Sequence, residues 1–206
     1  MVPIFILALA QAYQVKRKNK LHTFATMEII ETGIKDLLLL KPKVFKDERG
    51  YFYESYNTEL FKSIGIESNF IQDNQSLSNK NILRGLHFQA PPFAQGKLVR
   101  VIKGSVLDVA VDIRKNSTTY GQHFSVELTE ENFLMLWIPQ GFAHGFATLQ
   151  DHTIFSYKCT ETYHPETEGG LLWNDREIGI QWNIDNPILS EKDKKFEPFS
   201  LFISPF

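Results

Sequence analysis

The sequence of 206 residues has one cysteine, almost no net charge and little helical periodicity. With Cys159 alone, no disulfide can form within the chain, which is typical of proteins that work in a reducing compartment, so we expect a cytoplasmic location. The formal net charge of −2 provides no basic surface, so we expect no nucleic-acid partner. Residues 57–65 are the best candidate for a short helix.

Long hydrophobic runs are also missing. The apolar stretch PIFILALAQA is much shorter than the roughly 20 residues that a membrane span needs. A secretory signal carries its positive charge before its apolar part, whereas here the basic cluster at 16–20 follows it. We interpret residues 1–26 as a non-native or dispensable extension, with a weak membrane anchor as the alternative. Residues 27–206 are expected to form one domain without a membrane partner.

Aromatic residues and short β-type runs are abundant. The chain contains 17 Phe, 7 Tyr and 3 Trp, a composition that favours a β-rich core. Residues 97–103 and 106–113 flank a glycine-containing turn and predict a β-hairpin. Many short strands with few short helices predict an all-β fold. A cupin or jelly-roll β-barrel is our first prediction and a lectin-like sandwich the second. Further strands are predicted at 123–128, 133–138, 144–149 and 153–160.

Two histidines, His87 and His144, lie in or beside apolar strand candidates and raise the question of a metal site. A cupin metal site typically has a second histidine two positions after the first, where this chain has Gln89, and a carboxylate a few residues later, where residues 91–94 contain none. Two histidines are too few, since zinc-type centres use about three protein ligands. We therefore expect no metal.

Acid–base chemistry is the better interpretation of the same segments. Strict alternation in residues 153–160 places Tyr157 on one face, from which it can enter the barrel near His87, His144 and Lys97. An imidazole with a pKa near ~6.5 is a natural base and a phenol near ~10 a natural acid. Placed on opposite faces of one carbon, they can invert a stereocentre, and Lys97 can stabilise the enolate oxygen. The alternatives are that Tyr157 is a core residue and that His144 caps the preceding turn.

Arg84 and His87 have opposite parity in a regular strand, so only a bend can direct both side chains into one cavity. Gly85 between them permits a β-bulge.

Several long segments, in order from residue 27 to about residue 195, closely resemble the dTDP-4-dehydrorhamnose 3,5-epimerase family. They are FKDERGYFYESY, FIQDNQSLSNKNILRGLHFQ, QGKLVRVIKGSVLDVAVDIRKNS, LWIPQGFAHGF, YKCTETYHPETEGGLLWND and LSEKD. The resemblance implies a cupin-type β-barrel, a homodimer and a cofactor-independent isomerase. It also implies inversion of C3 and then C5 of dTDP-4-keto-6-deoxy-glucose, both next to the C4 ketone, in the biosynthesis of dTDP-rhamnose for cell-surface polysaccharide.

The resemblance also implies residue roles. By matching motif positions, His87 is the base, Asp193 orients it and Tyr157 is the acid. Lys97 lies near the C4 oxygen and His144 lines the pocket. The implied nucleotide contacts are Arg84 at the diphosphate, Tyr163 stacked on thymine, and Gln72 and Asn74 as polar contacts. The segment around Arg49 is implied to reach the partner subunit's site, with contacts from Phe45, Arg49, Phe52 and Glu54.

Three other functions remain open at this point. A relative that inverts one carbon, or a ketoisomerase, would share the scaffold, although Tyr157 favours inversion over ketone migration. A metal-dependent cupin and a non-catalytic sugar-binding module are the more distant alternatives.

Overall fold

The computed structural model describes residues 26–206, so the proposed extension lies, except for its last residue, outside the described residues. Within that range almost all regular structure is β, and the single α-helix, α1 (Thr58–Ser63), lies inside the predicted segment 57–65. Its N-cap is Asn57, whose side chain accepts a hydrogen bond from the Leu60 N–H at 3.1 Å. No helix in this part of the chain is both long and apolar enough to cross a membrane.

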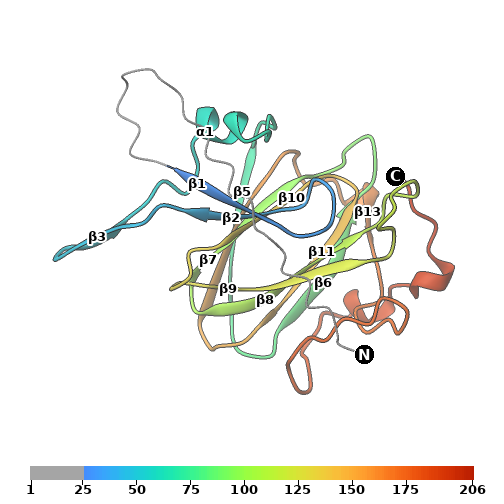
Figure 1. The fold of residues 1–206 in the computed structure, drawn as a ribbon. Helices are drawn as coiled ribbons and strands as arrows, with labels where there is room; N and C mark the ends of the chain where they lie inside the picture. Colours follow the sequence, from blue (N-terminus) through green and yellow to red (C-terminus); the bar gives the residue numbers. More distant parts are fainter. Residues whose placement is uncertain (1–25) are drawn as a thin grey trace, which may run out of the picture.

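Two antiparallel sheets lie face to face (Figure 1). The six-stranded sheet has the order β1-β2-β10-β7-β12-β5: β1 (Met27–Glu31), β2 (Leu38–Pro42), β10 (Met135–Ile138), β7 (Lys97–Lys103), β12 (Thr153–Cys159) and β5 (Gln72–Ser78). The five-stranded sheet has the order β13-β6-β11-β8-β9: β13 (Glu168–Gly170), β6 (Leu83–Gln89), β11 (Phe142–Thr148), β8 (Ser105–Asp112) and β9 (His123–Thr129). This arrangement is the predicted jelly-roll barrel.

The predicted β-hairpin between residues 97–103 and 106–113 is wrong. Strand β7 pairs with β10 and β12, whereas β8 pairs with β9 and β11, so the two strands belong to different sheets. Gly104, at φ +80°, turns the chain from one sheet to the other. A Cβ there would lie 2.5 Å from Thr153 Oγ1, so glycine is needed at this crossing.

The space between the sheets is filled by side chains from both of them. Val99 and Val101 of β7 meet Val106 and Ala110 of β8, with Phe155 of β12 fully buried among them. Both faces of β8 are buried, because its odd-numbered residues face a second apolar layer outside the five-stranded sheet. The C-terminal segment (red in Figure 1) contributes to that layer. Its residues Phe199, Phe202 and Phe206 pack against the apolar cluster that contains the odd-numbered residues of β8.

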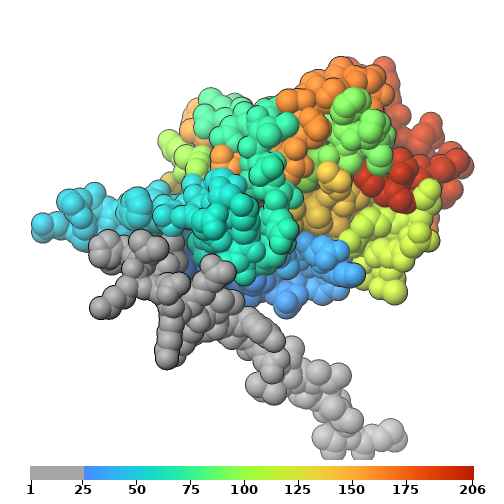
Figure 2. All heavy atoms as spheres, turned by 90° about the horizontal axis from the view of Figure 1, so that it is seen from above, coloured from blue at the N-terminus to red at the C-terminus, as the bar shows by residue number. Residues whose placement is uncertain are grey.

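A two-stranded arm, β3 (Phe45–Asp47) and β4 (Gly50–Phe52), extends from the barrel (Figures 1 and 2). Most of its residues are exposed, with Phe52 at 63%, whereas Phe45 is half-buried. The ring of Tyr51 in β4 packs edge-on against the ring of Phe133, with the ring centroids 4.9 Å apart. Exposed aromatic residues on a projecting hairpin are unusual for a chain without a partner. Three short 3₁₀ turns complete the structure: η1 (Pro165–Thr167), η2 (Asp193–Lys195) and η3 (Phe199–Leu201).

Candidate active site

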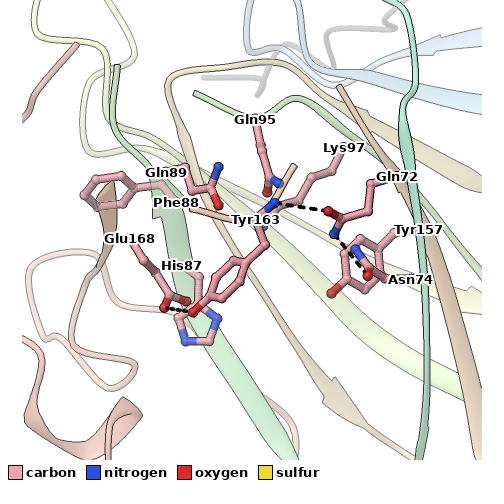
Figure 3. Close-up of a pocket in the computed structure, with 10 residues that line it drawn as sticks. All are labelled: Gln72, Asn74, His87, Phe88, Gln89, Gln95, Lys97, Tyr157, Tyr163 and Glu168. Atoms are coloured by element: carbon pink, nitrogen blue, oxygen red, sulfur yellow. Dashed lines mark hydrogen bonds between the residues drawn. The ribbon is translucent and has the colours of Figure 1, made fainter. Parts of the chain in front are cut away.

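Two adjoining cavities open between the sheets, and His87, Lys97 and Tyr157 line both of them. The smaller, of about 250 Å³, is otherwise walled by polar and aromatic residues: Gln72, Asn74, Phe88, Gln89, Gln95, Tyr163 and Glu168 (Figure 3). The larger, of about 610 Å³, is otherwise lined by Ile82, Leu83, Arg84, His144, Phe146, Ile188, Leu189, Ser190, Lys192 and Asp193. The three shared residues therefore stand where a polar compartment meets a partly apolar one.

His87 and Asp193 form a close pair. His87 projects from β6, Asp193 begins the turn η2, and His87 Nε2 lies 2.7 Å from Asp193 Oδ1. Asp193 is only 3% exposed. Burial by itself would raise the pKa of Asp193, but hydrogen bonds from His87 and from the Gly85 N–H hold it below its usual value. The pair is a histidine held and supported by an ionised carboxylate.

Strand β6 has the predicted bulge at Gly85. Its register against β11 shifts between the pairs His144–His87 and Phe146–Arg84, so β6 carries one extra residue. Gly85 has φ +133°, and a Cβ there would lie 2.5 Å from the Gly145 Cα. The bulge brings Arg84 and His87 into the wall of the same cavity, where Arg84 donates to Ser78 Oγ at 3.3 Å.

Tyr157 and Lys97 come from the opposite, six-stranded sheet. Burial raises the pKa of the Tyr157 hydroxyl, assisted by nearby Cys159 and opposed by Arg84, so the phenol stays protonated at neutral pH. Burial also lowers the pKa of Lys97, against the attraction of nearby acidic groups. Among residues 26–206, neither the Tyr157 hydroxyl nor the Lys97 ammonium has a hydrogen-bonding partner. Both groups are available to a ligand.

His144 lies within β11 and does not cap the preceding turn. Its Nε2 is 2.9 Å from Asp108 Oδ2 on β8, and both side chains are buried. The other carboxylate oxygen, Asp108 Oδ1, is buried without a hydrogen-bonding partner in the described chain. Sequence reasoning did not identify Asp108 as a site residue. The available signal was an acid on the inward face of an apolar strand, because buried carboxylates need partners.

Three of the nucleotide-contact candidates from the sequence, Gln72, Asn74 and Tyr163, line the smaller cavity (Figure 3), whereas Arg84 lines the larger one. The Tyr163 hydroxyl donates to Glu168 Oε2 at 2.8 Å, and its backbone N–H donates to Gln72 Oε1 at 3.0 Å. Gln72 in turn donates to Asn74 Oδ1 at 3.2 Å. Burial would raise the pKa of Glu168, but hydrogen bonds from Lys192 and Tyr163 lower it, so it is ionised. The polar and charged residues of these walls that sequence reasoning missed are Gln89, Gln95, Glu168, Ser190 and Lys192.

The structure does not bring the four candidate residues of the 45–54 segment to these cavities. Phe45, Arg49 and Phe52 belong to the arm, and Glu54 follows it. The Arg49 side chain is 85% exposed and pairs with Asp47 at 2.6 Å. These four residues therefore do not line either cavity of their own chain.

No three His, Cys, Asp or Glu side chains in residues 26–206 are grouped so that they could hold a metal ion. Two histidines, each paired with an aspartate, instead line the larger cavity together with a tyrosine and a lysine. The fold and this site define a cupin-type β-barrel equipped for acid–base chemistry.

Comparison with known proteins specifies the family. Residues 31–200 match the family model described as dTDP-4-dehydrorhamnose 3,5-epimerase. The chain is 57% identical to the dTDP-4-dehydrorhamnose 3,5-epimerase of Salmonella typhimurium, over 81% of this chain and 92% of that one. The chain therefore belongs to the dTDP-4-dehydrorhamnose 3,5-epimerase family, as its motifs indicated, and so to the carbohydrate isomerases.

Solved structures agree with this assignment. The epimerase of Legionella pneumophila in complex with dTDP-4-keto-L-rhamnose aligns with a TM-score of 0.83 and 46% identity, covering 86% of this chain and 95% of that one. A more distant structure, a 3'-monoepimerase from Streptomyces bikiniensis in complex with dTDP-quinovose, has a TM-score of 0.77 and 28% identity, covering 81% and 85%. The barrel is thus shared by enzymes that differ in the number of carbons they invert.

Proposed function

We propose that this protein inverts C3 and C5 of dTDP-4-keto-6-deoxy-glucose to give dTDP-4-keto-rhamnose, in the biosynthesis of dTDP-rhamnose. One observation carries the proposal: His87 and Tyr157 project from opposite sheets into the walls of the same two cavities. A sugar ring between them has a base on one face and an acid on the other. Inversion of a stereocentre next to a ketone needs this arrangement.

The chemistry follows from these positions. His87 removes the proton from C3, the C–H electron pair forms the enolate, and the negative charge moves to the C4 oxygen. Asp193 supports the imidazolium that results, and Lys97 donates a hydrogen bond to the enolate oxygen. Tyr157 then delivers a proton to the opposite face of C3, the C4 ketone reforms, and solvent returns the two side chains to their starting protonation states. The same steps at C5 complete the reaction, because the C4 ketone acidifies both neighbouring carbons.

Substrate binding is assigned to the surrounding residues. The ring of Tyr163 stacks on the thymine, and Gln72 and Asn74 make polar contacts with the nucleotide. His144 lies beside the sugar. Arg84 suits the diphosphate, because a guanidinium group can bond two phosphate oxygens at once. The Legionella relative binds a dTDP-sugar, which supports this choice of ligand.

We also propose a homodimer in which the arm reaches the partner subunit's cavity. The arm's exposed aromatic residues and the exposed Arg49 support this arrangement. Phe45, Arg49, Phe52 and Glu54 would then complete the nucleotide site of the other subunit. Two further proposals are that residues 27–206 are the functional domain, with residues 1–26 dispensable, and that the protein works in the cytoplasm.

The test is hydrogen exchange with solvent. The protein is incubated with dTDP-4-keto-6-deoxy-glucose in deuterated water, and the sugar is examined by mass spectrometry and NMR. We expect deuterium at both C3 and C5, with the rhamno product trapped by a reductase. Label at one carbon only would indicate a monoepimerase such as the Streptomyces relative. An intact, unlabelled substrate would overturn the proposal and favour a sugar-binding module.

A further inference from the structure

Gln89 is a buried glutamine whose hydrogen-bonding groups are directed at the protein backbone. It is 4% exposed and lies on β6, two residues after His87. Its Nε2 donates to Phe93 O at 2.7 Å and to Thr162 O at 3.1 Å. Its Oε1 accepts from the His164 N–H at 2.8 Å. The amide therefore fixes the peptide groups on either side of Tyr163.

A second glutamine holds the same loop. Gln95 Nε2 donates to Glu161 O at 2.7 Å and to Thr162 O at 3.1 Å. The loops at 90–96 and 160–164 are further joined by hydrogen bonds between Gly96 and Thr160 and by the stacked rings of Phe93 and His164, 3.7 Å apart. Together they form one block at the mouth of the smaller cavity.

Tyr163 itself has few contacts that could fix its position. It is 55% exposed, and its hydroxyl bonds to Glu168, whose strand β13 pairs with β6 at Gln89. The aromatic face is open to the cavity (Figure 3). Its location must therefore be set mainly by the backbone that carries it, since exposed side chains rotate freely unless packing restrains them.

We propose that Gln89 is a positioning residue that holds Tyr163 at a fixed distance from His87. This inference rests on the proposed function, in which Tyr163 binds the thymine while His87 acts on the sugar of the same ligand. Gln89 is rooted in the same strand as His87 and bonds to both neighbours of Tyr163. A ligand held at both points binds more tightly when their spacing is fixed, because the loop is already ordered and binding loses less conformational entropy.

The experiment compares Gln89→Met with the wild-type chain. Methionine has similar length but no N–H donor and only a weak sulfur acceptor. The Phe93 carbonyl and the His164 N–H therefore lose the bonds that Gln89 makes, and the Thr162 carbonyl keeps only Gln95. We expect the Kd for dTDP, measured by calorimetry, to rise about tenfold or more. KM should rise in parallel while kcat changes less than about threefold, because Tyr163 supplies binding that is equal in ground and transition states.

A double-mutant cycle separates positioning from a general structural role. If Gln89 acts through Tyr163, then Gln89→Met adds nothing to the loss in dTDP affinity already caused by Tyr163→Ala. The matched control is Gln140→Met, since Gln140 Nε2 donates to Ala94 O at 2.8 Å on the neighbouring loop without reaching residues 161–164. We expect this control to bind dTDP as the wild type does.

Each outcome has a defined meaning. Thermal unfolding reports whether Gln89→Met is folded, and if it is not, Gln95→Met tests the same loop through a less buried residue. A folded Gln89→Met with the wild-type Kd, or additive effects in the cycle, would overturn this inference alone. A wild-type chain that does not bind dTDP would overturn the proposed function and this inference with it.

Discussion

His87 Nε2 and Asp193 Oδ1 lie 2.7 Å apart although 106 residues separate them along the chain. The carboxylate arrives on the C-terminal segment, which bridges to the barrel at Ile82–Ile188 and places the ring of Phe196 5.7 Å from that of His87. The orientation of His87 thus depends on the C-terminal segment, which crosses outside the five-stranded sheet and packs against it through aromatic side chains.

Replacing His87 with alanine should abolish turnover but spare nucleotide binding. A general base contributes about 10²–10⁴-fold to rate, so deuterium incorporation at C3 and C5 should fall by at least about 100-fold. The Kd for dTDP should stay within about threefold of the wild type. The control is His152→Asn, at an exposed turn position with φ +55° that asparagine tolerates. Exchange by His87→Ala at the wild-type rate would refute the assignment of the base.

Tyr157→Phe should separate exchange from inversion. His87 can still remove a proton and return a deuteron to the same face, so label should enter while the product does not accumulate. NMR of the recovered sugar distinguishes label with retention from label with inversion. Tyr120→Phe, outside both cavities, is the control. Product formation by Tyr157→Phe at the wild-type rate would show that another group is the acid.

The lowered pKa of Asp193 makes a prediction about acid stability. A carboxyl whose pKa is lower in the folded state stabilises the fold above its unfolded pKa of about 3.9, and that stabilisation is lost as the pH falls through the folded-state pKa. The difference in unfolding free energy between wild type and Asp193→Asn should therefore have its largest value at pH 6 and become smaller below pH 4. Urea titrations from pH 3 to 6 measure it. A difference that does not vary with pH would contradict the ionised pair.

Lys97→Met should raise stability while lowering activity. Burial lowers the pKa of Lys97, so the folded chain binds fewer protons there than the unfolded chain between the two pKa values. Wild-type stability should therefore rise with pH across that window, up to about pH 10.4, and Lys97→Met should lack the rise. Lys103→Met, at the exposed end of the same strand, is the control and should keep it. Unchanged kcat in Lys97→Met would remove Lys97 from the enolate site.

Gly85→Ala should lower the free energy of unfolding more than Gly33→Ala does. Both Gly85 and Gly33 have positive φ, but a Cβ on Gly33 meets nothing within 4 Å, whereas one on Gly85 meets the Gly145 Cα at 2.5 Å. Overpacking costs about 1–3 kcal/mol, so Gly85→Ala should exceed Gly33→Ala by that amount in urea unfolding. Turnover should fall as well, because the bulge aligns Arg84 with His87. Equal losses in the two variants would contradict the close packing at the bulge.

Local sequence features alone predicted much of this protein. Strand alternation, glycine-containing turns and aromatic content were enough for the β-barrel, because side-chain period and turn conformation are properties of neighbouring residues. The bulge at Gly85 was also predictable, since the opposite parity of Arg84 and His87 and the glycine between them are visible in four consecutive positions. The family motifs added the proposed roles of His87, Tyr157 and Asp193.

Only the tertiary structure decided the rest. The turn at Gly104 reads as a hairpin, yet β7 and β8 join different sheets, because strand pairing depends on distant partners that local propensity does not specify. The pairing of His144 with Asp108 joins residues 36 positions apart, and the two bonds between Gln89 and the Tyr163 loop join residues 73 and 75 positions apart. A buried polar side chain needs a hydrogen-bonding partner, and this requirement can be inferred from the sequence. Which residue is the partner depends on how the two sheets pack.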